Sequence, residues 1–170
     1  DVIVAGIRAY NTQKELAKYH QFMLDYVDSG GLYVIQYNTY HGMLVKDIGP
    51  YPIEFPKTRK NNRITNEFAT TKFIEEDHLI LNSPNKIELS DFDNWVQERG
   101  LYFPEKWDKN YDALLRWSDP NEQPLDGGII VCDKGKGQFV YTGISFFRQL
   151  PAGVPGAYKL LANILSYGRE

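Results

Sequence analysis

Apolar runs and periodic apolar positions define the first 38 residues. Residues 2–7 form a short apolar run, the pattern of a strand buried on both faces, and residues 32–37 repeat it. Between them, residues 12–15 match a capping box, which predicts a helix start, and Gly30-Gly31 marks the helix end. The apolar face of this helix comprises Leu16, Tyr19, Met23 and Val27. Strand, helix and strand predict a βαβ unit with parallel strands.

The middle of the chain has weaker periodicity. Residues 41–85 contain several prolines, and the basic stretch 57–63 is typical of a solvated loop. Residues 90–99 predict a short helix, with Ser90 as N-cap and Gly100 after its end. The apolar side of that helix would be formed by Phe92, Trp95 and Val96.

Periodicity returns towards the end of the chain. Residues 111–117, 128–131 and 138–142 are strand-like, and the glycines of 133–137 predict a hairpin between the last two runs. Pro155 suits the first turn of a closing helix. Its buried face would be Ala157, Leu160, Leu161, Ile164 and Leu165. The pattern predicts an α/β domain with a partly parallel sheet, helices on both faces and a C-terminal β-hairpin.

Composition limits the classes of function. A chain of 170 residues fits one domain, 1–170, and a net charge of -3 gives no reason to expect nucleic acid as a partner. No apolar run approaches the roughly 20 residues that span a bilayer. Twelve tyrosines, nine phenylalanines and three tryptophans are many rings for one core, and exposed rings suit sugar faces or protein partners.

Polar residues follow the predicted strands. In open α/β sheets, ligands bind at the carboxyl ends of parallel strands. Arg8, Tyr10 and Asn11 follow the first strand, and Tyr37, Asn38 and Tyr40 follow the second. If the strand ending at Thr142 is parallel to both, it adds Ser145, Arg148 and Gln149. The arginines suit a carboxylate or phosphate, and the amides and tyrosines suit hydroxyl-rich ligands. Alternatively, these groups cap helices, bond loop backbone or contact a neighbouring domain.

A second polar group lies further along the chain. Glu98 and Arg99 precede the aromatic segment 101–104 and Trp107. One interpretation is an ion-paired, packed loop; the other is an aromatic platform for a sugar or a protein partner.

Known catalytic patterns are missing from the sequence. No Gly-x-Ser-x-Gly or Gly-x-Cys-x-Gly elbow is present, and Cys132, the single cysteine, fits a buried thiol in a strand. His20, His41 and His78 are scattered, and no second histidine stands at metal-ligand spacing from His78. We therefore expect no catalytic residue, metal or cofactor in this domain.

Several segments together resemble one family. They are Ile7–Thr12, Gly30-Gly31 with Gln36–Thr39, Leu81–Asn85, Trp95–Gly100 and Tyr141–Pro151. On these segments the chain is similar to the C-terminal, class I glutamine amidotransferase-like (ThuA-like, flavodoxin-like) domain of bacterial LmbE-like, PIG-L family deacetylases. The resemblance covers nearly the whole chain.

The resemblance implies a flavodoxin-like fold and a truncated domain, because that fold begins with a strand and helix upstream of Asp1. It also implies a parent protein with a separate zinc-dependent N-acetylglucosamine-type deacetylase domain, and export in bacteria. The zinc motif of that domain is not found here, and Tyr37-Asn38 stands where amidotransferases carry cysteine.

The resulting hypothesis is a non-catalytic accessory domain that binds carbohydrate or packs on its own catalytic domain. Two alternatives stay open: a hydrolase that uses Glu98, His78 or Tyr37, and a protein-assembly module.

Overall fold

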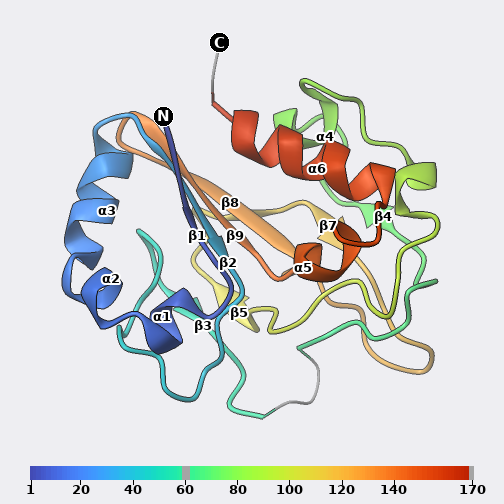
Figure 1. Cartoon of the computed structure of the whole chain (residues 1–170), viewed down its shortest axis with the longest axis horizontal. Helices are drawn as coiled ribbons and strands as arrows, with labels where there is room; N and C mark the ends of the chain where they lie inside the picture. Colours follow the sequence, from blue (N-terminus) through green and yellow to red (C-terminus); the bar gives the residue numbers. More distant parts are fainter. Residues whose placement is uncertain (59–61, 169–170) are drawn as a thin grey trace.

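A five-stranded sheet organises the protein. The computed structural model describes residues 1–58 and 62–168, and the strand order is β1-β2-β9-β8-β6. The strands are β1 (Val2–Ala5), β2 (Leu32–Gln36), β9 (Gly137–Thr142), β8 (Ile129–Lys134) and β6 (Asp112–Ala113). The first three are mutually parallel, β8 is antiparallel to β9, and β6 is antiparallel to β8. This mixed α/β architecture confirms the predicted fold class, and it is compatible with a flavodoxin-like open sheet (Figure 1).

Both faces of the sheet are covered, which explains the continuous apolar runs. In β2, Leu32 and Val34 enter one hydrophobic cluster, whereas Tyr33 and Ile35 enter the other. Successive side chains of a strand point to opposite faces, so a strand with helices on both sides has no solvent-facing position. The predicted βαβ unit is confirmed by the parallel register of Val2 with Leu32.

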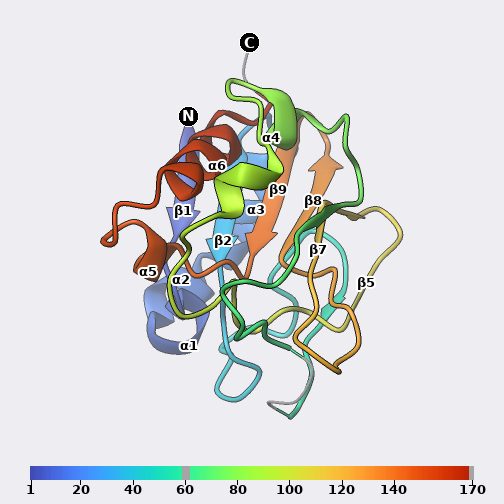
Figure 2. The same cartoon turned by 90° about the vertical axis from the view of Figure 1, so that its right-hand side faces the viewer.

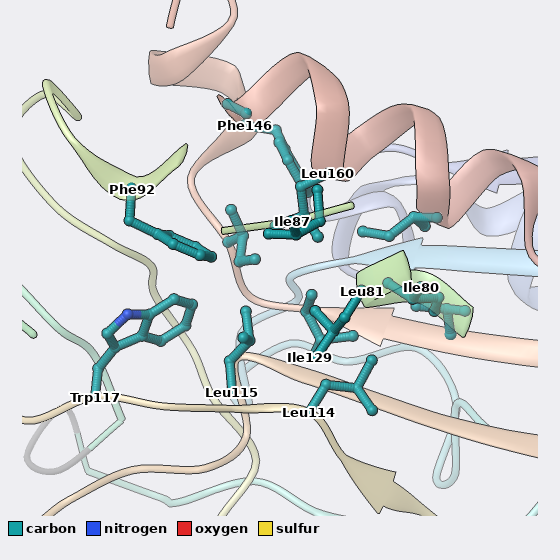
Figure 3. Close-up of a cluster of buried hydrophobic side chains, with 14 of the residues drawn as sticks. Ile80, Leu81, Ile87, Phe92, Leu114, Leu115, Trp117, Ile129, Phe146 and Leu160 are labelled. Atoms are coloured by element: carbon teal, nitrogen blue, oxygen red, sulfur yellow. The ribbon is translucent and has the colours of Figure 1, made fainter. Parts of the chain in front are cut away.

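One face lies under the C-terminal helix. Helix α6 (Pro155–Ser166) packs here with α4 (Leu79–Asn82) and the 3₁₀ turn η1 (Leu89–Phe92), on the face seen in Figure 2. Pro155 occupies the first turn as predicted, because that position needs no backbone N–H partner. Figure 3 shows how Leu160 and Phe146 approach the side chains that project from the sheet and from α4.

The opposite face carries three short helices rather than the single helix predicted. They are α1 (Ala9–Thr12), α2 (Lys14–Lys18) and α3 (His20–Asp28). The predicted capping box is wrong, because Thr12 closes α1 and its hydroxyl donates to the Arg8 carbonyl. Gln13 is extended and Tyr19 leaves helical geometry, so the chain turns twice. The predicted C-terminal stop holds, since Gly30 has a φ of 116°.

The predicted helix over residues 90–99 is wrong. The chain forms only η1, whose capping box is made by Glu88 and Asp91. Asn94 and Gln97 then adopt φ values of 58° and 66°, which end any helix. Phe92 and Trp95 are buried as predicted, but they are delivered by a loop.

Short elements complete the structure. The β8–β9 hairpin is confirmed, with Gly135 in the left-handed region. The predicted strand 111–117 is divided between β6 and β7 (Leu115–Arg116), and β7 pairs with β4 (Lys72–Phe73). A second small sheet joins β3 (Ile53–Glu54) to β5 (Lys106–Trp107), and α5 (Phe146–Gln149) follows β9. Within the described residues, no helix combines the length and apolar character needed to cross a membrane.

Candidate functional site

Three parallel strands direct their carboxyl ends to one edge of the sheet. Strand β9 runs parallel to β2, so Arg148, which follows β9, lies at the same end of the sheet as Arg8 and Tyr37. The Arg8 backbone N–H donates to the Tyr37 carbonyl at 2.7 Å, which fixes the β1 and β2 tips together. Helices α1 and α5 lie at this end of the sheet (Figure 1).

Tyr37 is the centre of a charged and aromatic cluster. Its ring centroid lies 5.1 Å from that of Tyr102 and 5.7 Å from that of Phe147. Burial raises the pKa of Tyr37, with Tyr102 and Glu98 adding to the rise, while Arg8 and Arg148 oppose it. The hydroxyl bonds to no other described residue and reaches solvent. It is therefore a free phenol O–H that suits donation to a ligand.

Glu98 and Arg148 form the charged side of this cluster. Arg148 Nε donates to Glu98 Oε1 at 2.6 Å, and Glu98 is buried. Ser145 and Gln149 hold the Glu98 backbone by donating to its carbonyl. The ion pair fixes Arg148, whereas the guanidinium of Arg8 has no ion-pair partner among residues 1–58 and 62–168.

A pocket of about 210 Å³ opens beside the cluster. It is lined by Arg8, Thr39, Tyr40, His41, Pro56, Lys57, Thr58, Asn62 and Tyr102. Arg8 and Lys57 supply positive charge, and no carboxylate belongs to the described lining. The His41 ring bonds the Lys57 carbonyl at 3.1 Å and so connects the β2 tip to the loop that carries Lys57. The pocket offers two cations surrounded by hydroxyl and amide groups.

Backbone strain accompanies this arrangement. Arg8 and Tyr102 have φ values of 55° and 56°, a region that non-glycine residues rarely occupy. Such conformations cluster at functional sites, where surrounding structure holds them in place. Both residues line the pocket, so the strain orients two of its side chains.

Three predicted ligand-binding residues instead form hydrogen bonds within the protein. Asn38 accepts from the Tyr10 backbone N–H at 2.9 Å and donates to the Gln36 carbonyl. The Asn11 amide bonds Thr39 through both of its ends. Gln149 accepts from the Val96 N–H and donates to carbonyls around it. These amides hold the loops that form the pocket. The alternative role predicted for them, bonding to loop backbone, is therefore the one they have.

Tyr10, also predicted as a ligand-binding residue, belongs to a buried chain that the sequence does not reveal. Its hydroxyl lies 2.7 Å from both Tyr33 Oη and His20 Nδ1. Burial raises the pKa of Tyr10 to about 12 and also raises that of Tyr33. Burial lowers the pKa of His20, and the neighbouring Asp47 partly opposes this shift. The chain connects β2, α1 and α3.

Arg99 does not reach the site, which corrects its prediction as a ligand-binding residue. It is buried, and its guanidinium donates to the carbonyls of Ala69 and Phe92. Its charge lies 5.3 Å from the Trp95 ring centroid. Although Arg99 is adjacent to Glu98 in sequence, its side chain organises a loop rather than a ligand.

His78 lies at the other end of the sheet. It caps α4 by accepting from the Ile80 N–H, and it contacts the Tyr167 ring. The nearby charge of Asp133 is on the last part of β8, opposite the strand tips. A hydrolytic site that combines Glu98 with His78 is therefore excluded.

Cys132 is buried, and burial raises the pKa of its thiol to about 12. Among the described residues, no cluster of His, Cys, Asp and Glu is arranged to hold a metal.

Sequence reasoning missed part of the pocket. Lys57 was contained in a stretch interpreted as a solvated loop, of which residues 59–61 lie outside the described residues. Tyr102 was identified only as part of an aromatic segment. Neither residue follows a strand, so the rule for strand tips gave no signal for them.

Comparisons with known proteins support the fold. No family model matches the chain, and no curated protein sequence matches it. The cytoplasmic protein STM3548 of Salmonella typhimurium is similar in structure, with a TM-score of 0.60 and 13% identity over 98% of this chain and 71% of that one. The cytoplasmic protein STM1381 of Salmonella typhimurium LT2 gives 0.59 and 12%, over 100% and 72%. At this identity the likeness shows the fold alone.

These neighbours correct one expectation. The family resemblance implied export from the bacterial cytoplasm, whereas both similar structures are described as cytoplasmic proteins. The expectation of an extracytoplasmic location is therefore contradicted.

Proposed function

We propose that this domain binds a hydroxyl-rich ligand with a phosphate or carboxylate group in the pocket between Arg8, Lys57 and Tyr102. The observation that carries the proposal is the pocket lining, which combines two cations with hydroxyl groups and no described carboxylate. An anion entering there exchanges water for charge-assisted hydrogen bonds, which are about twice as strong as neutral ones. A sugar phosphate or sugar acid has the required combination of groups.

Tyr37 supports a binding role over a catalytic one. A raised pKa keeps its phenol protonated at neutral pH, so the group donates a hydrogen bond and does not act as a base. The neighbouring Glu98 has one oxygen held by Arg148. The domain accordingly acts without its own chemistry in this proposal.

The test compares glucose 6-phosphate, glucuronate, inorganic phosphate and glucose by isothermal titration calorimetry. We expect the anionic sugars to bind more tightly than glucose, and added salt to weaken them. Arg8→Asn is the informative variant, because asparagine tolerates the φ of 55° at this position and removes the guanidinium. It should weaken glucose 6-phosphate binding about tenfold, as expected for losing one charged hydrogen bond.

Lys86→Asn is the matched control, since it removes an exposed cation outside the pocket. Equal binding of all four compounds, or equal effects of the two variants, would disprove the pocket assignment.

A hydrolase is the second candidate, favoured by the free hydroxyl of Tyr37 beside Glu98. It predicts turnover of ester or glycoside substrates that Tyr37→Phe or Glu98→Gln abolishes. The binding proposal predicts that neither wild type nor variant shows turnover above the uncatalysed rate.

The wider context is also a proposal: the domain serves as the accessory domain of a zinc-dependent, carbohydrate-directed deacetylase of the PIG-L type. Its support is the sequence resemblance of the segments given above. Co-expression of this domain with the full parent protein's deacetylase region should yield a complex. A parent sequence without a zinc motif would remove this assignment and leave the pocket proposal intact.

A further inference from the structure

A second hollow shares the segment Pro56–Thr58 with the pocket at Arg8. It has a volume of about 790 Å³, within the range of ligand-binding clefts. Its lining is Glu54, Phe55, Pro56, Lys57, Thr58, Pro104, Glu105, Trp107, Gln123, Pro124, Leu125 and Asp126. We call this hollow the Trp107 groove. Unlike the pocket at Arg8, it contains three carboxylates and one cation.

Trp107 differs from the other two tryptophans. The indole N–H of Trp95 donates to the Asp91 carbonyl and that of Trp117 to Thr71, and both rings are buried. Trp107 is partly exposed, and its N–H has no hydrogen-bond partner among the described residues. Trp107 and Glu54 also line an adjoining hollow of about 250 Å³. The indole therefore stands between two open spaces with an unused donor.

Two of the groove's carboxylates are available to a ligand. Asp126 is taken, because both of its oxygens accept from Arg116 at 2.6 Å. Glu105 is exposed and forms no ion pair with a described residue. Glu54 approaches Lys106 only at 3.9 Å, with both side chains about 70% exposed (69% and 71%), and such a contact is weak.

Trp107 and two available carboxylates thus line the groove. An indole ring attracts a C–H surface or a cation, its N–H suits an acceptor, and the carboxylates suit donors with positive charge. A lysine or arginine side chain has no acceptor. A protonated amino sugar supplies a C–H face, oxygen acceptors and an ammonium group in one ring.

We infer that the Trp107 groove is a binding site for an amine-bearing oligosaccharide, with Trp107 as the stacking platform and Glu54 and Glu105 as the ammonium acceptors. This site adjoins the Arg8 pocket through Pro56, Lys57 and Thr58, but Arg8 does not line it. The carboxylates of the groove and the cations of the pocket suit ligand groups of opposite charge.

The test titrates a glucosamine tetrasaccharide into the protein at a pH where its amines are protonated. Calorimetry should detect binding, and the ligand should shield Trp107 fluorescence from acrylamide. The fully N-acetylated tetrasaccharide, of the same length but without charge, should bind at least about fivefold more weakly, because the carboxylates lose their partners. Equal affinity of the two would overturn the inference.

Variants localise the site. Trp107→Ala should weaken binding about tenfold, and Trp107→Phe, which keeps a ring but removes the N–H, should lose less. Glu54→Gln with Glu105→Gln should weaken binding about fivefold, whereas Glu75→Gln with Glu76→Gln, a matched change beside α4, should have no effect. Thermal unfolding verifies that each variant is folded, with Trp107→Phe as the conservative variant if Trp107→Ala is not.

The remaining outcomes separate this inference from the first proposal. Arg8→Asn should leave tetrasaccharide binding unchanged, so either site can fail alone. Tetralysine that binds as tightly, with the same sensitivity to Trp107→Ala, would assign the groove to a cationic peptide and overturn the amino-sugar inference.

Discussion

Replacing Arg99 tests whether it is a structural or a ligand-binding residue. Its guanidinium donates to the Ala69 carbonyl through Nε and Nη2, at 3.2 and 2.9 Å, and to the Phe92 carbonyl through Nη1 at 2.5 Å. Arg99→Leu leaves these two buried acceptors without their partner. The residue is 4% exposed, so water does not readily replace the guanidinium at these acceptors.

The size of the effect follows from these contacts. An unsatisfied buried acceptor costs about 1–3 kcal/mol, and loss of the cation–π contact with Trp95 adds about 0.5–2 kcal/mol. Removing a buried charge returns part of this, because the desolvation of the guanidinium is no longer required. We expect Arg99→Leu to lower the free energy of unfolding by about 3 kcal/mol, a large part of the 5–15 kcal/mol typical of domains. Arg99→Lys, which keeps the charge but not the planar fork, should fall between.

Urea denaturation followed by tryptophan fluorescence measures this loss, since Trp95 and Trp117 are buried. Arg8→Asn is the counterpart: it should leave the unfolding midpoint unchanged or raise it slightly, while weakening ligand binding. A loss below about 1 kcal/mol for Arg99→Leu would refute the structural role. So would weaker ligand binding by the folded Arg99→Leu protein at unchanged stability.

Three further perturbations test other parts of the structure. Burial lowers the pKa of His20, so the unfolded chain binds protons first as pH falls through 6.5, and stability should fall between pH 7.5 and 5.5. In urea titrations His20→Gln should reduce this dependence, and the part that stays is assigned to His78, whose pKa burial also lowers. Gly156→Ala would place a Cβ 1.8 Å from the Asp91 carbonyl oxygen, and it should lower the free energy of unfolding by at least about 2 kcal/mol. Gly6→Ala has open space around the new Cβ and should lower it far less. Similar melting temperatures for both variants would contradict the packing of η1 on α6. Asp119 accepts from the Thr65 N–H and hydroxyl and from the Asn66 N–H, so Asp119→Ala should lower the free energy of unfolding by about 2 kcal/mol; an unchanged unfolding curve would show that water satisfies these donors.

The fold was predictable where its pattern is local. Residues 2–38 and 128–166 contain apolar runs and helix ends whose spacing determines the element, and the strands and the closing helix are present, whereas the first predicted helix is three short helices. The segment between them depends on distant partners. Residues 90–99 illustrate this, because left-handed Asn94 and Gln97 break a pattern of apolar spacing that otherwise fits a helix. Two-residue strands such as β3 and β5 have too few positions to show alternation.

The candidate site was predictable only in its location. Strand direction places Arg8, Tyr37 and Arg148 at one edge, and that much follows from the βαβ unit and the orientation of β9. Which side chains reach the site depends on the loops. Glu98 pairs with Arg148, whereas the adjacent Arg99 bonds the buried carbonyls of Ala69 and Phe92, a difference that no spacing in the sequence encodes.

The buried chain from Tyr33 through Tyr10 to His20 has a consequence for spectroscopy. In the tautomer that carries the His20 proton on Nε2, Nδ1 is the acceptor, so the Tyr10 hydroxyl donates to it and the Tyr33 hydroxyl donates to Tyr10. All protons in the chain then point in one direction. These two hydroxyl protons are shielded from exchange with water and should give separate low-field resonances. Protonation of His20 would reverse the Tyr10 donor, so both resonances should move together and mark the state of the α1–α3 face.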